Sequence, residues 1–255
     1  MKFGRKPAVH NRRTMRLAIA FHRALASLGT APTVSDDYIS AVMKQSPQGW
    51  ICWLNNSLGD CVAEDSGHEL MLHSANASTI VIPSTQDILA LYEAVGGYNP
   101  SDPSTDQGCD ETSMEQYMMQ AGLCGQKSVA TGPVDPSNMD HLRWAVQIFG
   151  ACRLGIAVTD QMMNDFNAGN AWETFSGDVE GGHDVPIVKY DAAFAYVVTW
   201  GKLQPVAWSL VANSNFLQEA HLSVWPDFTN AGGTTPAGFK LADMIADAQA
   251  VEQTS

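Results

Sequence analysis

Apolar residues recur at helical spacing in the first half of the chain and in short unbroken runs in the second half. Residues 61–74, 84–96, 114–123 and 139–148 carry apolar side chains at intervals of three and four, which predicts helices. The second of these opens on Ser84-Thr85-Gln86-Asp87, a typical helix start. Strands are predicted for four apolar runs after residue 150: residues 153–158, 184–190, 194–200 and 220–225. The pattern predicts an α+β fold with a helical first part and an antiparallel, β-rich second part.

The two ends of the chain differ from this central body. Residues 1–45 start basic, include a predicted helix over residues 14–28, and then reach the stop signal Gly29-Thr30-Ala31-Pro32. Residues 226–255 contain a Gly-Gly-Thr-Thr-Pro linker followed by a short amphipathic helix over residues 239–251. We therefore expect a basic N-terminal arm (1–45), a two-lobed body (lobes about 46–150 and 151–225), and a C-terminal linker with a helix (226–255).

Composition indicates a folded globular protein. The chain has 255 residues, of which 45% are hydrophobic and 16% charged, and no apolar stretch approaches membrane-spanning length. The apolar run at residues 17–21 is too short for a secretory signal and leads into His22 and Arg23, so no signal peptide is predicted. We expect a cytoplasmic protein or a component of an assembly such as a virion, with no membrane contact.

Charge is distributed unevenly along the chain. The formal net charge is -13, yet seven of the fourteen Lys and Arg residues precede the first acid, Asp36. An acidic body repels nucleic acid, so contact with nucleic acid is expected only through the arm. A protein assembly contact through residues 1–35 is the other use of such an arm, and a solvated, frayed terminus is the simplest explanation.

The five cysteines are widely spaced and odd in number, which argues against a disulfide framework. Cys61 follows Gly59 and Asp60 at a predicted helix start, where the helix dipole stabilises a thiolate. A single cysteine at such a place can equally be a small buried hydrophobe. His183 follows Gly181 and Gly182 and opens a predicted strand, and Thr199-Trp200-Gly201 ends the next strand.

These segments, in this order, resemble the papain-like cysteine proteases over roughly residues 46–225. The family has a Gln six residues before the nucleophilic Cys, where this chain has Asn55, and an Asn-Ser-Trp-Gly turn, which Val198-Thr199-Trp200-Gly201 resembles. The strand from Gly181-Gly182-His183 to Tyr190, together with Asp106-Gln107-Gly108-Cys109, is similar to further family segments. The resemblance implies a two-lobe fold and a cysteine peptidase or amide hydrolase acting on a peptide or protein substrate without a cofactor or metal.

The resemblance also implies roles for individual residues. Cys61 would be the nucleophile, His183 the general base and Asn55 an oxyanion donor, while Trp200 would shield the histidine. The residue that orients His183 is Thr199 when counted from the histidine and Val198 when counted from the tryptophan, and the sequence leaves this open. The glycines Gly59, Gly181 and Gly182 are expected to line the binding site.

Several residues around Cys61 depart from the family pattern. Glu64, Asp65 and His68 share a helix face with Cys61, and acids on that face oppose a thiolate. His68 lies seven helical residues away, too far for direct contact with Cys61, and a metal site built on Cys61, His68 and His183 lacks short ligand spacing. These departures favour the alternative of a catalytically inactive papain-like structural or binding protein, similar to uncharacterised bacteriophage and bacterial proteins and docked through its basic arm.

Overall fold

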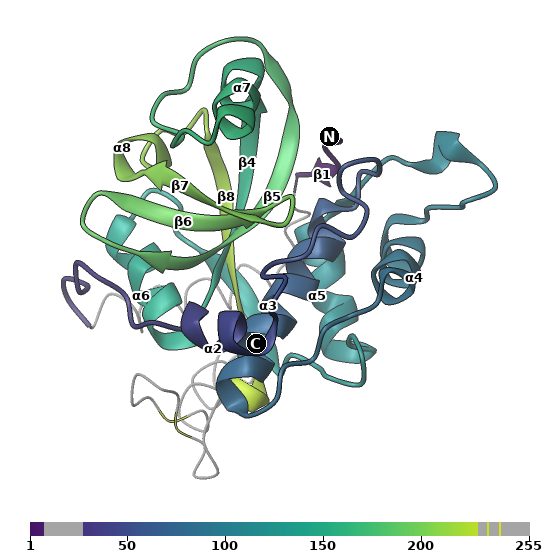
Figure 1. Ribbon diagram of the computed structural model, residues 1–255, viewed down its shortest axis with the longest axis horizontal. Helices are drawn as coiled ribbons and strands as arrows, with labels where there is room; N and C mark the ends of the chain where they lie inside the picture. The colour runs from purple at the N-terminus through teal and green to yellow at the C-terminus, as the bar shows by residue number, and fades with distance from the viewer. Residues whose placement is uncertain (8–27, 229–233, 235–239, 241–255) are drawn as a thin grey trace, which may run out of the picture.

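The computed structural model describes residues 1–7, 28–228, 234 and 240 (Figure 1). The helices predicted for residues 14–28 and 239–251, and the Gly-rich linker between the body and the second of them, lie almost entirely outside this part of the chain. No helix among the described residues is long and apolar enough to cross a membrane.

Helices dominate the described chain up to residue 149. This part contains the strands β1 (Arg5–Lys6), β2 (Cys109–Asp110) and β3 (Ala130–Val134), a 3-10 turn η1 (Pro103–Thr105), and the helices α2 (Ile39–Gln45), α3 (Cys61–Ala77), α4 (Thr85–Gly96), α5 (Glu111–Gln120) and α6 (Met139–Phe149). Strands dominate the part that follows: β4 (Cys152–Thr159), β5 (Val179–Tyr190), β6 (Phe194–Thr199), β7 (Lys202–Ala207) and β8 (Leu217–Val224), with the helices α7 (Asp160–Ala168) and α8 (Trp208–Val211) and a second 3-10 turn, η2 (Pro226–Phe228). The predicted α+β class is confirmed.

Local sequence accounts for several helix boundaries. Ser84 and Asp87 form a reciprocal capping box at the start of α4, as the Ser-Thr-Gln-Asp motif predicts. Asn138 caps α6, and Gly150, with φ +83°, ends that helix in the left-handed conformation. The sequence prediction missed α2, α7, β3 and β7, which are short.

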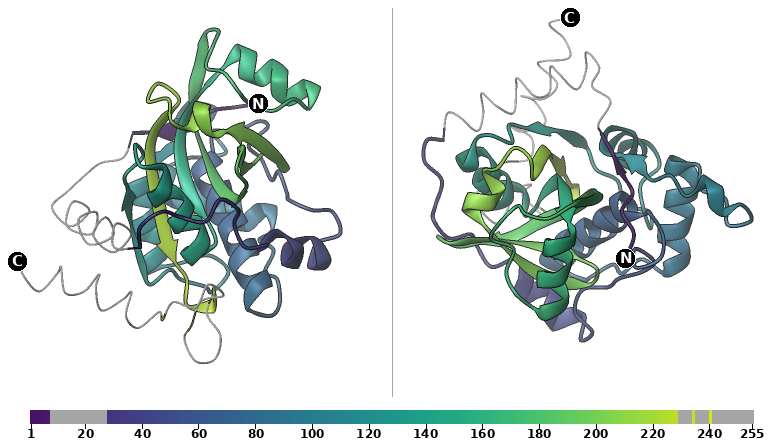
Figure 2. Two further views of the ribbon diagram at one scale, coloured as in Figure 1. Left: turned by 90° about the vertical axis from the view of Figure 1, so that its left-hand side faces the viewer. Right: turned by 90° about the horizontal axis from the view of Figure 1, so that it is seen from above.

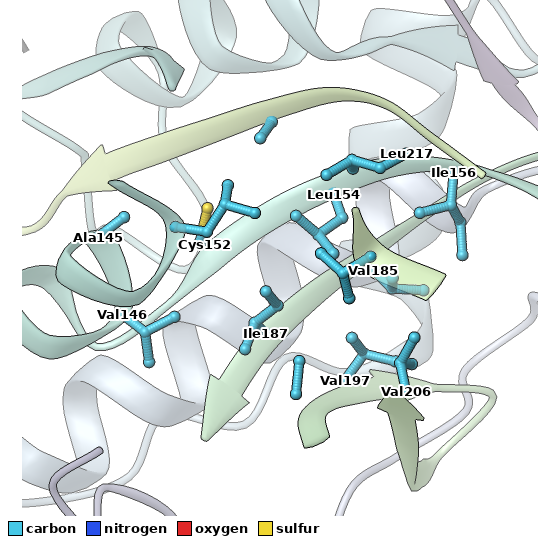
Figure 3. Packing of buried hydrophobic residues seen from close by; sticks show 14 of the residues in the cluster. Ala145, Val146, Cys152, Leu154, Ile156, Val185, Ile187, Val197, Val206 and Leu217 are labelled. Atoms are coloured by element: carbon cyan, nitrogen blue, oxygen red, sulfur yellow. The ribbon is translucent and has the colours of Figure 1, made fainter. Parts of the chain in front are cut away.

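Six strands form one antiparallel sheet in the order β3-β8-β4-β5-β6-β7. Its core contains apolar side chains from β4 to β8 together with Ala145 and Val146 of α6 (Figure 3). A second cluster fills the helical side and includes Val62, Leu70 and Leu72 of α3. Two separate cores agree with the two lobes expected from the sequence, although the predicted residue boundaries stay predictions.

Helix α3 lies between the two lobes and packs against β5 (Figure 1). Nearly all of its residues are buried, unlike those of a surface helix. β4 is likewise buried on both faces: Leu154 and Ile156 belong to the core of the sheet, whereas Arg153 points to the opposite side and contacts α3. The start of α3 and the middle of β5 therefore meet inside the protein.

Both described parts of the predicted arm contact the body. Residues 1–6 lie where the two lobes meet, near the start of α3 (Figure 2). Ser35 and Tyr190 exchange hydrogen bonds, and Val42 of α2 is fully buried in the helical core.

Candidate functional site

A small, partly open cavity lies between the start of α3 and strands β5 and β6. Its volume, about 10 Å³, is on the scale of one water molecule. The residues that line it include the four predicted catalytic residues and the predicted binding residue Trp200. The full set is Asn55, Cys61, Glu64, Asp65, His68, His183, Asp184, Val198, Thr199 and Trp200. Tertiary structure thus brings these four predicted residues together, with Trp200 beside them.

His183 is held in a fixed orientation. Its Nε2 lies 2.8 Å from Thr199 Oγ1, and its ring stacks on Trp200 with centroids 4.5 Å apart and an interplanar angle of 10°. Between Val198 and Thr199, the structure therefore assigns the hydrogen bond to Thr199. The other ring nitrogen, Nδ1, is buried and has no hydrogen-bond partner among the described residues. Burial lowers the pKa of His183 to about 3, and the nearby charge of Arg5 acts in the same direction.

A tight turn places Trp200 against the histidine. Thr199 pairs with Lys202, so Trp200 and Gly201 form a two-residue hairpin loop between β6 and β7. Both have positive φ, +44° and +71°, as a type I′ turn requires. Positive φ is uncommon for a tryptophan, and stacking on His183 together with burial in the sheet core compensates for the strain.

Cys61 is the first residue of α3 and is only 1% exposed. Burial raises the pKa of its thiol to about 12, although hydrogen bonds from the backbone N–H groups of Asp184 and Gly4 act in the opposite direction. In this arrangement the sulfur is a thiol and His183 is a neutral imidazole. The two side chains share a cavity, but they do not form an ion pair.

Asn55 lies at the cavity, but other groups occupy its amide N–H donors. Its Nδ2 donates to Leu58 O at 3.1 Å and to Asp60 Oδ1 at 3.3 Å. Its Oδ1 is buried and has no hydrogen-bond partner among the described residues. The oxyanion role of Asn55 stays a prediction, because it requires the amide to change partners.

The acids next to Cys61 are buried, and burial reduces their negative charge near neutral pH. Burial raises the pKa of Asp60 to about 8 and that of Glu64 to about 7. Asp60 is the N-cap residue of α3, but its side chain makes no capping hydrogen bond, contrary to the expectation for an Asp at this position. Glu64 accepts hydrogen bonds from the backbone N–H groups of Leu54 and Asn55 at 2.7 and 2.9 Å, which ties the preceding loop to the helix.

A buried arginine, which sequence reasoning missed, crosses from one lobe to the other. Arg153 Nε of β4 lies 2.8 Å from Asp65 Oδ2 of α3 and 3.4 Å from Glu111 Oε2 of α5. Its Nη2 lies 3.5 Å from Asp184 Oδ2 and donates to Val62 O at 2.9 Å. A single charged residue in the apolar run Cys152-Arg153-Leu154 was the signal available in the sequence, because a buried charge requires a partner.

His68, which helical spacing placed too far from Cys61 for direct contact, lines the cavity and forms its hydrogen bond with another residue. Its Nε2 lies 2.7 Å from Ile51 O, and its ring contacts Trp50 and Trp53. Burial lowers the pKa of His68 to about 4. No group of three His, Cys, Asp or Glu side chains within the described ranges is arranged to hold a metal ion.

The three glycines predicted to line the binding site contact residues 3–5 instead of the cavity. A methyl group on Gly181 would meet the Phe3 side chain, and one on Gly182 would lie 2.8 Å from Arg5 O. One on Gly59 would lie 3.2 Å from the Gly4 Cα. Contact between the start of the chain and these glycines was not predicted from the sequence.

Comparison with known proteins identifies the fold. No protein-family model matches the chain, and no curated protein matches it. Among solved structures it is similar to xylellain, a cysteine protease from Xylella fastidiosa, with a TM-score of 0.62 and 14% identity over 87% of this chain and 95% of that one. It is also similar to a procathepsin B from Trypanosoma congolense, with a TM-score of 0.52 and 12% identity over 86% of this chain and 82% of that one.

A third similar structure comes from work on the mite allergens Blo t 1 and Der p 1, with a TM-score of 0.50 and 15% identity over 77% of this chain and 72% of that one. At these identities the likeness concerns the fold and not the chemistry. The topology and the match over most of the chain agree with the resemblance seen in the sequence. The chain adopts the papain-like cysteine protease fold.

Proposed function

We propose that the protein is a cysteine peptidase or amide hydrolase that acts on a peptide or protein substrate through Cys61 and His183. The observation that carries the proposal is that a cysteine at the N-terminus of the central helix and a histidine on the facing strand line one cavity of a papain-like fold. The start of a helix and a nearby imidazole are the two features that activate a thiol.

In the proposed reaction the Cys61 proton moves to His183 Nδ1, and the sulfur attacks the carbonyl carbon of the scissile amide. The C–N bond then breaks as His183 returns the proton to the leaving amine, which leaves a thioester on Cys61. Water, deprotonated by His183, hydrolyses the thioester and regenerates the thiol. The backbone N–H of Cys61, which has no carbonyl partner in its helix, would stabilise the oxyanion, with Asn55 as the second predicted donor.

Thr199 is the positioning residue in this scheme. Its hydroxyl lies against Nε2 of His183, so the opposite nitrogen, Nδ1, is left for the proton of Cys61. Trp200 covers one face of the imidazole and limits its rotation.

The proposal is tested by reaction with a peptidyl epoxide, followed by mass spectrometry of the modified peptides. We expect selective modification of Cys61, lost in the Cys61→Ala variant and reduced at least ~100-fold in His183→Ala, because a general base contributes at least this much. The other thiols are internal controls, in particular the exposed Cys124 and the half-buried Cys52. Equal modification of Cys124 and Cys61 would contradict the proposal.

Replacing Thr199 by valine is expected to lower kcat/KM for peptide hydrolysis by about 10- to 100-fold, because the imidazole loses the contact that fixes its orientation. Thr199→Ser keeps the hydroxyl and should recover most of the activity. The matched readout is the pH profile of kcat/KM, whose histidine limb should move in Thr199→Val and not in Thr199→Ser. An unchanged profile together with an unchanged rate in Thr199→Val would show that another group orients the histidine.

A second candidate function is a binding or assembly protein without catalysis. Burial favours it, because it raises the pKa of Cys61 to about 12 and lowers that of His183 to about 3, which disfavours the thiolate-imidazolium pair. In that case the basic residues 1–35 would dock the protein onto a partner, for example within a virion, as expected from the charge distribution. Deleting residues 1–35 and measuring incorporation into the assembly tests this role, and unaltered incorporation would remove it.

A further inference from the structure

Residues 1–6 lie where the two lobes meet (Figure 2), and their backbone hydrogen bonds go to the helical lobe. β1 pairs in parallel with β2, and the Cys109 N–H donates to Gly4 O at 3.0 Å. On the loop before α3, the Lys2 N–H donates to Asn55 O at 3.2 Å. The segment therefore lies in the site as an extended strand, held by its backbone.

Phe3 covers the histidine from the open side. Its ring meets His183 edge-on with centroids 5.9 Å apart and meets Trp200 at 6.0 Å. Its side chain also fills the space beside Gly181, where a methyl group on the glycine would approach it to 2.7 Å. The aromatic ring completes the closed environment that lowers the pKa of His183.

Gly4 lies against Gly59, two residues before the cysteine. Its backbone N–H, with that of Asp184, acts against the effect of burial and lowers the pKa of Cys61. A side chain at this position is excluded, since a methyl group on Gly4 would overlap Gly59 O, and one on Gly108 would overlap Gly4 O. Glycines on both sides of the strand thus leave just enough room for a peptide backbone that itself carries a glycine.

The Arg5 side chain lies in a buried acidic site on the sheet lobe. The residue is 8% exposed, and its guanidinium forms an ion pair with Glu219 and a hydrogen bond with Gln218, both on β8. Gly155 of β4 provides the space for the arginine stem, because a methyl group there would lie 2.9 Å from Arg5 Cδ. A half-buried carboxylate opposite a guanidinium is a specific recognition element and not a surface contact.

These contacts lead us to propose that the site is a groove for an extended peptide carrying the pattern aromatic–glycine–arginine, and that residues 3–5 of the chain occupy it. The aromatic side chain covers His183, the glycine lies against the loop before Cys61, and the arginine pairs with Glu219. The proposal deepens the proposed function and rests on its choice of site, since it names the class of ligand that the site takes. A peptide of the same pattern in solution competes with the attached segment, which has the advantage of high effective concentration.

The first arm of the test measures the rate at which iodoacetamide alkylates Cys61 in the full-length chain. Arg5→Ala removes the seated guanidinium, and we expect at least about 10-fold faster alkylation, because a hydrogen-bonded charge holds the segment in place. Lys6→Ala is the matched control, since Lys6 is the exposed neighbouring base and its loss should leave the rate unchanged. Gly4→Ala provides a second route to displacement, and circular dichroism checks that each variant is folded. Equal rates in Arg5→Ala, Gly4→Ala and the unmodified chain would overturn the proposal.

The second arm adds the peptide acetyl-Met-Lys-Phe-Gly-Arg-Lys-amide to the Arg5→Ala chain. We expect this peptide to restore protection of Cys61, and the versions with Ala for Gly or Glu for Arg to protect at least ~10-fold less well. Equal protection by all three peptides would overturn the assignment of the glycine and arginine positions. Alkylation and protection require no turnover. Absence of hydrolysis alongside these results would therefore contradict the peptidase function while still supporting the peptide-binding groove.

Discussion

Replacing Arg153 by methionine is expected to lower the free energy of unfolding by about 3–5 kcal/mol, measured by urea denaturation at pH 6. The guanidinium is 1% exposed and lies among Asp65, Glu111 and Asp184, which belong to α3, α5 and β5. Without it these buried carboxyl groups lose the cation that lies among them, and the backbone carbonyl of Val62 loses a donor. Since α3 and α5 belong to the helical lobe and β4 and β5 to the sheet, the loss should weaken the junction that positions Cys61 against His183.

Lys44→Met is the control for this substitution, because Lys44 is exposed on α2 and contributes no buried pair. The double variant Arg153→Met, Asp65→Asn should recover part of the loss, since it removes one of the carboxyl groups left unpaired. A decrease below about 1 kcal/mol in Arg153→Met would mean that protons, and not the arginine, neutralise the acids of this cluster.

Stability is expected to be greatest near pH 5–6 and to fall by at least about 2 kcal/mol between pH 6.5 and pH 9. Burial raises the pKa of Glu64 to about 7 and those of Asp60 and Glu69 to about 8. A folded-state pKa above the unfolded value means that the folded chain binds more protons, so this stability is present at low pH and is lost as the pH rises through 7 and 8. Burial lowers the pKa of His221, but its partner Glu115 raises it by more, so the net shift is upward. Above pH 6.5 the loss of this proton also lowers the stability.

The opposite effect comes from histidines that are buried in the neutral form. Burial lowers the pKa of His68 and His73 to about 4 and that of His183 to about 3, so their contribution is present above pH 6.5 and is lost as the pH falls toward 4. Below pH 6.5 the effects of the histidines and of the carboxyl groups on the free energy of unfolding have opposite signs. The maximum stability is therefore expected between the pH ranges in which each effect dominates.

Glu69→Gln tests the assignment of the alkaline loss, because the amide does not titrate. The unfolding free energy should fall less steeply between pH 7 and pH 9 in Glu69→Gln. The fall should be unchanged in Glu180→Gln, where the replaced acid is exposed. Stability that stays constant from pH 6.5 to pH 9 in the unmodified chain would be inconsistent with buried, protonated carboxyl groups.

The α+β class and the order of the main elements followed from the sequence, because they depend on local patterns. Helical spacing, a Ser-Thr-Gln-Asp capping motif and short apolar strands are each specified by neighbouring residues. The position of Cys61 at a helix start and that of His183 on a strand were accessible for the same reason. The short strand β7 was not, because its pairing with β6 and not a pattern of its own stabilises it.

Contacts between distant residues account for what the sequence left open. The choice between Val198 and Thr199 depended on one hairpin turn, in which Trp200 adopts a positive φ that local sequence does not predict. The sequence indicated that Glu64 and Asp65 oppose a thiolate; in the folded protein Glu64 binds the backbone N–H groups of the preceding loop and Asp65 pairs with Arg153 from the other lobe. Glu64 lies 10 residues from Leu54, and Asp65 lies 88 residues from Arg153, so these pairs are defined only by folding.

The sequence by itself predicted, through its resemblance to the papain-like cysteine proteases, that Cys61 and His183 share one site, and both line one cavity of the folded protein. Only the tertiary structure decided how deeply the two side chains are buried. This burial keeps Cys61 as a thiol and His183 as a neutral imidazole. The basic start of the chain looked like an external arm from its charge. Its first residues lie instead against His183 and the loop before Cys61, because the glycines beside them and Glu219, distant in sequence, leave space and charge for Phe3, Gly4 and Arg5.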